Sequence, residues 1–311
     1  MGGSDLSAGE QLQSIWRLGG LSIKELGIRV WNGILERNLL GRASELAYNY
    51  IFSIFPLILV LLSLFGLFAS RGSLLRANLM FYLSTVLPPQ AFHVLDLTIQ
   101  EVTSHTSGSK LTFGALLTLW AASGGMTSMI STLNEVYGVR DSRPWTKVRV
   151  LAVGLTMGIS ALVLSALILI LLGGIIAGWA GDQFHLGSVA VFSGKILLWP
   201  AAFLFVVIAF SVIYYFAPDL EEQHWYWITP GSLFGVLLWL AASFGFRAYL
   251  HFFNSYSRTY GSLGAVIVLL LWFYVAGLTF LIGGEINAEI EHAAAAHGHV
   301  EAKAEGQKKA A

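Results

Sequence analysis

The residues of this chain most able to do chemistry are ionisable side chains within or beside long apolar stretches. Glu285 follows an uncharged run that begins at Leu263. Glu45 precedes the first apolar stretch, and Arg247 lies near the end of another. A charge inside a bilayer is costly, so such a residue is a candidate for an ion, proton or substrate path, or is neutralised by a partner. The sequence leaves both roles open for these three residues.

Polar residues recur at helical spacing in and beside the same stretches. Glu45, Asn49 and Ser53 are four residues apart, so they share one helix face. A second stripe with spacing i, i+4, i+8 and i+11 comprises Ser123, Thr127, Ser131 and Asn134. The last apolar stretch contributes Tyr274, Glu285 and Asn287. Lipid cannot satisfy polar groups, so these faces are predicted to look into a helix bundle, where they either pack helices together or line a path.

A basic cluster lies between two apolar stretches and comprises Arg140, Arg143, Lys147 and Arg149. It has the charge to bind polyanions. The same cluster is also what cytoplasmic loops of membrane proteins carry under the positive-inside rule. The pattern therefore favours a cytoplasmic loop without excluding an anion-binding role.

Hydrolytic chemistry finds no support in the residue pattern. The chain has no cysteine, and its His residues lack the spacing of metal ligands, apart from three in the Ala-rich end of the chain, His292, His297 and His299. There is no Gly-rich phosphate loop and no serine elbow. We therefore expect no enzyme activity, no catalytic residue, no metal, no cofactor and no nucleic-acid partner.

The composition identifies the elements that must position these residues. The chain is 56% hydrophobic and only 12% charged, with a mean hydropathy of +0.69. Soluble domains carry about 25% charged residues, so this is an integral membrane protein. About 20 apolar residues cross a hydrocarbon core as a helix. Six stretches qualify, at residues 46–69, 111–133, 148–179, 196–216, 228–250 and 263–285.

The predicted fold class is an all-α membrane protein with a bundle of six transmembrane helices in residues 43–291. Residues 1–42 form a cytoplasmic N-terminal arm, and Ile23, Leu26, Val30 and Ile34 on one helical face indicate an amphipathic helix. That helix either lies on the inner leaflet or docks on the bundle. Residues 70–110 are predicted as an external helical hairpin, and residues 292–311 as a disordered cytoplasmic tail.

Several sequence blocks resemble the YihY/BrkB family of bacterial inner-membrane proteins. They are "ELAYNYIFSIFPLILVL", "NEVYGVRDSRPWTKVRVLAV", "YYFAP", "WITPGSLFGVLLWLAASFGFRAYL" and "YGSLGAVIVLLLWFYVAGLTFLIGGEINAEIEH". The likeness covers about residues 40–292, and its last block is the most specific. Matching positions include Ala47, Tyr48, Ser53, Pro56, Tyr137, Gly138, Pro230, Gly231, Tyr260, Gly261, Gly284, Glu285 and Asn287. The resemblance implies six transmembrane helices but no activity, since members have been called ribonuclease BN, virulence factor or transporter-like.

Polar faces inside a bundle and basic residues at its inner mouth favour a transporter or exporter of an anionic or amphiphilic, lipid-like substrate. One alternative is a non-enzymatic membrane scaffold or assembly protein, and another is a membrane-bound ribonuclease. The expected partners are the lipid bilayer, its anionic headgroups and further copies of the chain as a homo-oligomer. The expected location is the bacterial inner membrane.

Glu285 is predicted to have a basic partner at the inner mouth. It is expected at the C-terminal end of a helix, where the helix dipole already places partial negative charge. Bases expected on the same side as Glu285 are Arg42, Arg143, Lys147 and Arg149. Arg247 is expected at the opposite face of the membrane.

The topology can be tested with reporter fusions. A cytoplasmic N-terminus leaves six Lys and Arg outside, namely Arg71, Arg76, Lys110, Lys195, Arg247 and Arg258, and places the other 12 of 18 inside. Because positive charge is retained in the cytoplasm, fusions after residue 220 and at the C-terminus should report the cytoplasm. Fusions near residues 90 and 187 should report the exterior. An external C-terminus would contradict the six-span topology.

Overall fold

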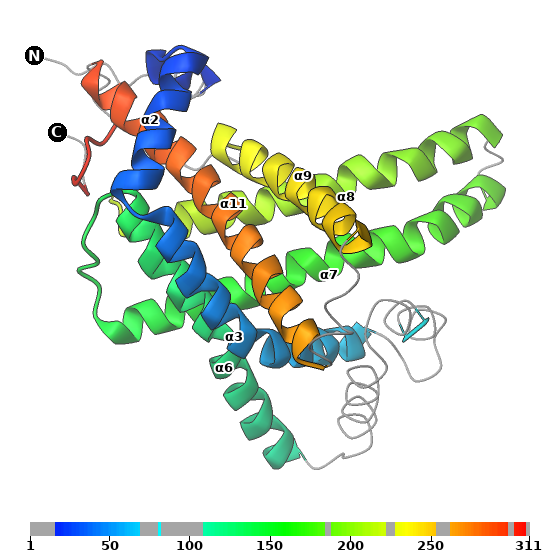
Figure 1. Ribbon diagram of the computed structural model, residues 1–311. Helices are drawn as coiled ribbons and strands as arrows, with labels where there is room; N and C mark the ends of the chain where they lie inside the picture. The colour runs from blue at the N-terminus through cyan, green and yellow to red at the C-terminus, as the bar shows by residue number, and fades with distance from the viewer. Residues whose placement is uncertain are drawn as a thin grey trace, which may run out of the picture. The chain divides into compact units, whose positions relative to one another are not determined.

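All regular elements in the residues that the structure describes are helices (Figure 1). The computed structural model describes residues 16–68, 80–81, 108–183, 188–221, 228–252, 262–297 and 302–308. The elements are η1 (Leu18–Gly20), α2 (Ile23–Glu36), α3 (Leu39–Phe68), α6 (Gly108–Val136), α7 (Trp145–Gln183), α8 (Ser188–Phe216), α9 (Pro230–Phe252) and α11 (Ser262–Ala296). The all-helical fold is thus confirmed, and each predicted span falls largely or wholly on one of the long helices.

Four stretches of these helices are long and apolar enough to cross a membrane. They are Trp145–Ile170, Phe192–Phe216, Pro230–Leu250 and Val266–Ala296. They correspond to the last four predicted spans. The predicted external hairpin at 70–110 lies outside the described residues, apart from 80–81 and the start of α6.

The chain divides into two compact units. The first comprises Met1–Phe52, Gly124–Leu155 and Phe210–Ala311, and the second comprises Ser53–Ser123 and Thr156–Ala209. All the candidate charged residues of the sequence belong to the first unit. The helices of this unit are η1, α2, α9 and α11 with parts of α3, α6, α7 and α8.

In the first unit, α11 lies between α9 and the N-terminal elements η1 and α2 (Figure 1). Small residues allow the close contact with α9, because side chains at Gly231 or Gly235 would collide with the backbone of Gly283 or crowd it. Tyr214 of α8 covers the same place and donates a hydrogen bond to the carbonyl oxygen of Phe280 at 2.6 Å. Gly231 and Gly235 thus form a small-xxx-small pair, the spacing that is typical of close helix contacts in membranes.

The N-terminus of α9 is tied to α11 by hydrogen bonds. Pro230 occupies the first helical position, where its missing N–H has no intrahelical partner to lose. Thr229 and Ser232 cap the helix reciprocally, each side chain accepting from the other's backbone N–H at 3.1 and 3.0 Å. Asn287 of α11 accepts from the N–H of Gly231 and donates to Thr229 Oγ1. A residue predicted to be part of a polar path thus holds two helices together.

The helix α2 docks on the C-terminal part of α11. Ser22 and Glu25 form a capping box at its start. Leu26 and Val30 are buried against Ile290. Both belong to the apolar face of the predicted amphipathic helix. The sequence leaves open whether that face contacts the inner leaflet or the bundle. The structure shows that they face protein.

The chain turns sharply between α2 and α3. Asn38 has a φ of 50°, in the left-handed region, which Asn tolerates better than most residues. Its side-chain Oδ1 accepts from the N–H of Gly41 in the first turn of α3 at 3.3 Å. This turn lets two helices of different direction follow each other almost without a linker.

The end of the chain differs from the prediction of a disordered tail. The helix α11 runs on to Ala296, beyond the predicted span end at Glu285. Residues 302–308 make ionic contacts within the first unit. Lys303 is buried and donates to Glu291, while Lys308 pairs with Asp219. Composition suggests disorder because these residues are small and polar. Their charged side chains nevertheless form ion pairs.

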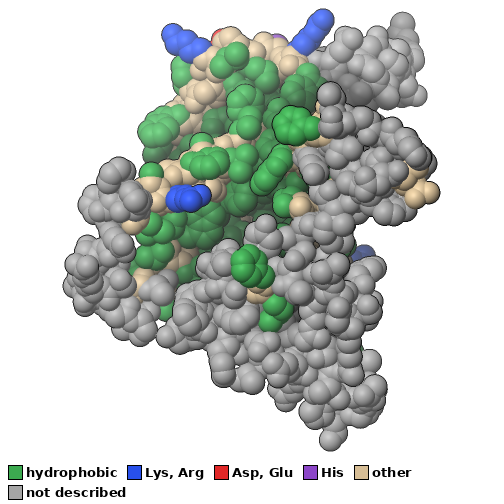
Figure 2. All heavy atoms as spheres, turned by 90° about the vertical axis from the view of Figure 1, so that its right-hand side faces the viewer, with side chains coloured by type: hydrophobic (Ala, Val, Ile, Leu, Met, Phe, Trp, Pro, Cys, Tyr) green, Lys and Arg blue, Asp and Glu red, His purple; other side chains and the backbone are tan. Residues whose placement is uncertain are grey.

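In the second unit, Gly173 of α7 makes room for the side chain of Leu198 on α8. Many large apolar side chains of this unit are exposed, among them Phe192, Leu197 and Trp199. Hydrophobic side chains also cover most of the described surface on the face that Figure 2 shows, with few Lys and Arg among them. Such a surface suits lipid rather than water.

Two glycines of α9 provide a matched test of the α9–α11 contact. A Cβ at Gly231 meets the Gly283 carbonyl oxygen and Asn287, whereas one at Gly245 meets nothing within 4 Å. Gly231→Ala should lower the free energy of unfolding by about 1–3 kcal/mol through overpacking. Gly245→Ala should be neutral, or stabilising by up to about 1 kcal/mol through helix propensity. SDS-induced unfolding in mixed micelles measures both, and equal effects would contradict the contact.

Candidate functional site

The centre of the candidate site is an ion pair between Arg37, directly after α2, and Glu285 of α11. The Glu285 side chain has 0% of its surface exposed, and that of Arg37 has 11%. Arg37 Nη1 donates to Glu285 Oε1. A buried carboxylate next to a guanidinium is stable only as a pair, because either charge alone would be strongly disfavoured.

Gly33 leaves the space for this pair. A Cβ at that position would overlap Glu285 Oε1 and come within 2.9 Å of Arg37 Nη1. Because Gly33 has no side chain, α2 approaches α11 closely enough for the residue one turn later to reach Glu285. The glycine is therefore part of the site although it carries no functional group.

Arg37 contacts two further carboxylates. Nη1 lies 3.3 Å from Glu289 Oε1, and Nη2 lies 2.7 Å from Oε1 of Glu305 in the segment 302–308. We call Arg37, Glu285, Glu289 and Glu305 the Arg37 cluster. Arg29 is a weaker neighbour, 3.9 Å from Glu289. One buried guanidinium thus joins three carboxylates from α11 and the end of the chain.

The electrostatics of the cluster follow from this geometry. Burial alone would lower the pKa of Arg37, but the charges of Glu285, Glu305 and Glu289 outweigh it and raise that pKa. The hydrogen bond from Arg37 lowers the pKa of Glu305 below its usual value. Both groups therefore stay charged at neutral pH.

One atom of the cluster has no partner among the residues that the structure describes. Glu285 Oε2 is buried and neither accepts nor donates a hydrogen bond there. A buried polar atom without a partner is costly, and such atoms are uncommon enough to need an explanation. The orphaned oxygen makes Glu285 the strongest functional candidate of the chain.

The prediction of a basic partner for Glu285 is confirmed, but the bases named for it are wrong. The partner is Arg37, a residue of the N-terminal arm that the sequence does not single out. Leu26, Val30, Gly33 and Arg37 follow the pattern i, i+4, i+7 and i+11, so Arg37 lies on the docked face of the helix. Glu285 is also not at a helix C-terminus, because α11 continues to Ala296. Burial, not a helix end, creates the need for a cation.

The polar stripe of α3 separates into buried and exposed members. Asn49 donates to Ser128 Oγ on α6 at 3.1 Å and to the Glu45 carbonyl oxygen at 2.9 Å. Ser53 is buried. Glu45 itself is exposed and lies 3.4 Å from Arg42. The structure thus brings Asn49 into a helix contact but does not bring Glu45 to Glu285.

The predicted stripe of α6 is likewise divided. Ser123 and Asn134 are buried, and Ser123 donates to the Trp120 carbonyl oxygen of its own helix. Thr127 accepts from Arg149 of α7 at 3.1 Å. Ser131, by contrast, lies on the exposed side of α6. Sequence spacing missed the buried residues Ser128 and Thr132, which lie one position further along.

A second ionic network joins the connections between helices. Asn134 donates to Asp141 and accepts from the N–H of Asp219. Arg143 binds Asp141 through two nitrogens and also donates to the Ala217 carbonyl oxygen. Asp219 accepts from Ser142 and from Lys308. Burial raises the pKa of Asp219, but hydrogen bonds from Lys308 and Ser142 lower it to about 2.

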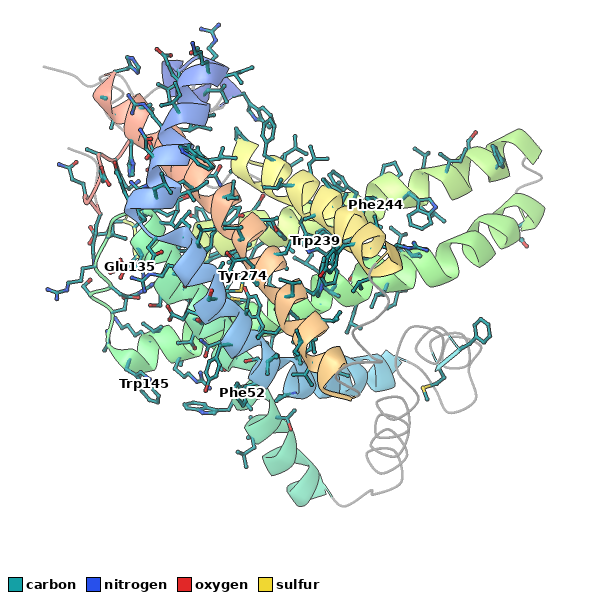
Figure 3. All side chains as sticks on the ribbon, viewed as in Figure 1. Phe52, Glu135, Trp145, Trp239, Phe244 and Tyr274 are labelled. Carbon is teal, nitrogen blue, oxygen red and sulfur yellow. The ribbon has the colours of Figure 1, made fainter. Side chains whose placement is uncertain are left out.

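The remaining predicted residues stand apart from the Arg37 cluster. Arg140 and Lys147 of the basic cluster are exposed, and Arg247 is exposed on α9. Tyr274 is half-buried on α11 (Figure 3). The structure thus uses Arg143 and Arg149 in internal contacts and leaves the other bases at the surface.

These features define a class of protein. An all-helical fold, four apolar membrane-length helices and a buried carboxylate in one of them, paired with Arg37, are features of a polytopic integral membrane protein. The family model described as Virulence factor BrkB matches residues 30–308, so the chain belongs to the YihY/BrkB family. Among the described residues, no group of three or more His, Asp or Glu is placed to hold a metal ion.

Two kinds of relative illustrate the family. The ribonuclease-like protein YfkH of Bacillus subtilis (strain 168) is 30% identical over 248 residues, covering 80% of this chain and 88% of YfkH. A UPF0761 membrane protein of Xanthomonas campestris pv. campestris (strain B100) is 24% identical over 275 residues, covering 84% of this chain. This chain spans 59% of the length of that longer relative. No solved structure matches.

The Arg37–Glu285 pair can be tested by a double-mutant cycle. Arg37→Met leaves a buried carboxylate unpaired and should cost about 3–5 kcal/mol of unfolding free energy. In a Glu285→Gln background the same change should cost less, because the most deeply buried of the three carboxylates that Arg37 contacts is then uncharged. Unfolding by SDS in mixed micelles gives each value.

Arg42→Met is the matched control for this cycle. Its contacts with Glu45 and Glu135 are exposed, so it should cost at most about 1 kcal/mol. If Arg37→Met costs the same in the wild-type protein and in the Glu285→Gln background, the two side chains do not interact.

Proposed function

We propose that this chain is a membrane transporter or exporter of an anionic or amphiphilic, lipid-like substrate. The observation that carries the proposal is Glu285, a fully buried carboxylate within a membrane-length helix, with one oxygen paired and the other without a partner among the described residues. Charges inside membrane helices are rare and mark ion or substrate pathways by default. A purely structural helix contact would not need a buried oxygen without a hydrogen-bond partner, such as Glu285 Oε2.

The proposed setting is the bacterial inner membrane, with six spans and both termini in the cytoplasm. The helices α3 and α6 supply the first two spans, and the four candidate membrane helices supply the others. The distribution of Lys and Arg supports this orientation. In it, the Arg37 cluster lies near the cytoplasmic end of α11.

The contacts of Arg37 with carboxylates support an anionic substrate. Its Nη2 binds Glu305, whose side chain is 64% exposed and belongs to the segment 302–308. Arginine binds carboxylates and phosphates through the same planar donors. An anionic headgroup can therefore replace the Glu305 carboxylate at Nη2 while Nη1 stays with Glu285.

A membrane scaffold or assembly protein is the second candidate, and the surface of α9 favours it. Figure 3 shows Trp239 on the side of α9 near α11, where its ring centre lies 6.3 Å from that of Trp272. Phe234, Leu237 and Phe244 are exposed on this helix. A partner protein or a second copy could pack there. Such a function would need no buried charge and no movement of solute.

A ribonuclease activity is not part of the proposal. The relative YfkH has a ribonuclease-like name, and that name applies to YfkH. In this chain, neither a nucleophile motif nor metal-ligand spacing supports a hydrolytic site.

Reconstitution in liposomes tests the proposal. Vesicles containing the protein and a panel of labelled anions and anionic lipids should show flux or lipid movement that protein-free vesicles lack. Glu285→Gln should abolish most of this activity, because the pairing of Arg37 changes. Glu45→Gln, at an exposed position, should retain it.

Size-exclusion chromatography shows whether both variants are folded. If the folded Glu285→Gln protein transports as the wild type does, Glu285 has no role in a path. If no substrate of the panel moves faster with the protein than without it, the scaffold function gains support.

A further inference from the structure

The helix α2 presents three separate faces. One face, with Leu26, Val30 and Gly33, is buried on α11. A second face is polar and exposed, and it comprises Glu25, Asn32 and Glu36. The third is apolar and exposed, with Ile28 at 52%, Trp31 at 62% and Leu35 at 57%. Among the described residues, only the first of these faces packs against another part of the protein.

The exposed apolar face is a continuous stripe. Its residues follow i, i+3 and i+7, so they line up over two helical turns. Lys24 lies at i−4 of the same stripe and is exposed. The acidic residues Glu25 and Glu36 are on the polar face. Isolated exposed apolar residues need no explanation, but an aligned stripe beside a separate polar face is typical of a helix at a membrane surface.

The place where α2 docks identifies the membrane as the surface that the stripe meets. The helix packs on Ile282, Ile286 and Ile290. All three lie in the second half of the candidate membrane span Val266–Ala296, and Ile286 and Ile290 follow the predicted span end at residue 285. A helix fixed to that part of a span is held at the bilayer boundary. Its outward apolar side therefore meets lipid.

We propose that α2 is an interfacial helix that inserts Ile28, Trp31 and Leu35 into the membrane surface, with Lys24 binding anionic lipid headgroups. The long apolar stem of Lys24 can lie along the stripe while its ammonium reaches the phosphate layer. Tryptophan is favoured at the same depth. This inference depends on the insertion of α11 and not on transport.

A second copy of the chain fits this stripe less well. Stable protein interfaces bury about 800 Å² per partner. Three side chains, of which even the largest buries at most about 250 Å², do not reach that area. The basic residue on the stripe would also repel its counterpart in a symmetric pair.

The chain has no cysteine, so a single introduced cysteine can be labelled at a chosen position. Ile28→Cys and Leu35→Cys place a fluorophore on the stripe, and Asn32→Cys places it on the polar face of the same helix. The full-length proteins are reconstituted in phosphatidylcholine vesicles with or without phosphatidylglycerol. A quencher attached to lipid near the headgroup should quench the stripe labels several-fold more than the Asn32 label. Iodide in the buffer should show the reverse order.

Lys24→Gln tests the headgroup contact. In vesicles with phosphatidylglycerol it should reduce lipid quenching at the stripe, and in phosphatidylcholine alone it should change nothing. An unchanged signal in both would overturn the role of Lys24. Equal lipid quenching of stripe and Asn32 labels would overturn the insertion of α2. Oxidative cross-linking of Ile28→Cys into dimers would assign the stripe to a second copy and also overturn it.

Discussion

The arrangement of the first unit depends on one constraint, which is that the carboxylate of Glu285 has no contact with solvent. Its own helix offers no ammonium or guanidinium group, because α11 carries no Lys or Arg. The cation must therefore come from another element. Arg37 supplies it only because Gly33 lets α2 lie against α11, and the left-handed turn at Asn38 then redirects the chain into α3. The entry of the chain into the bundle is thus set by a buried charge as much as by apolar packing.

The end of the chain follows the same rule. Its segment 302–308 has almost no apolar side chains, yet Lys303 reaches Glu291, Glu305 reaches Arg37 and Lys308 reaches Asp219. The last contact also joins the network around Ser142, so the segment connects α11, the residue after α2 and the helix connections. Individual exposed pairs contribute little, but partly buried pairs that share partners hold a segment in a defined place. This explains why a sequence with the composition of a disordered tail has an ordered position.

The sequence predicted well what depends on the length and polarity of a single helix. The long apolar runs placed the helices. It predicted poorly what depends on pairing between distant segments. Arg37 is close to Glu285 only after α2 has docked, and no spacing along the chain reveals that. Ser131 is predicted inside by its register, but between Ala122 and Val136 nearly every position of α6 is buried or half-buried, so one register does not select the exposed positions.

The shared use of Arg37 links the proposed transport to the end of the chain. Nη1 contacts Glu285 and Glu289, and among the described residues Nη2 contacts Glu305. An anion that binds at Nη2 therefore competes with Glu305, since removing Glu285 would strand a buried charge. Docking of Glu305 at Arg37 and binding of an anionic headgroup at the same nitrogen oppose each other. A substrate that takes the place of Glu305 can do so while Lys303 and Lys308 still hold the segment.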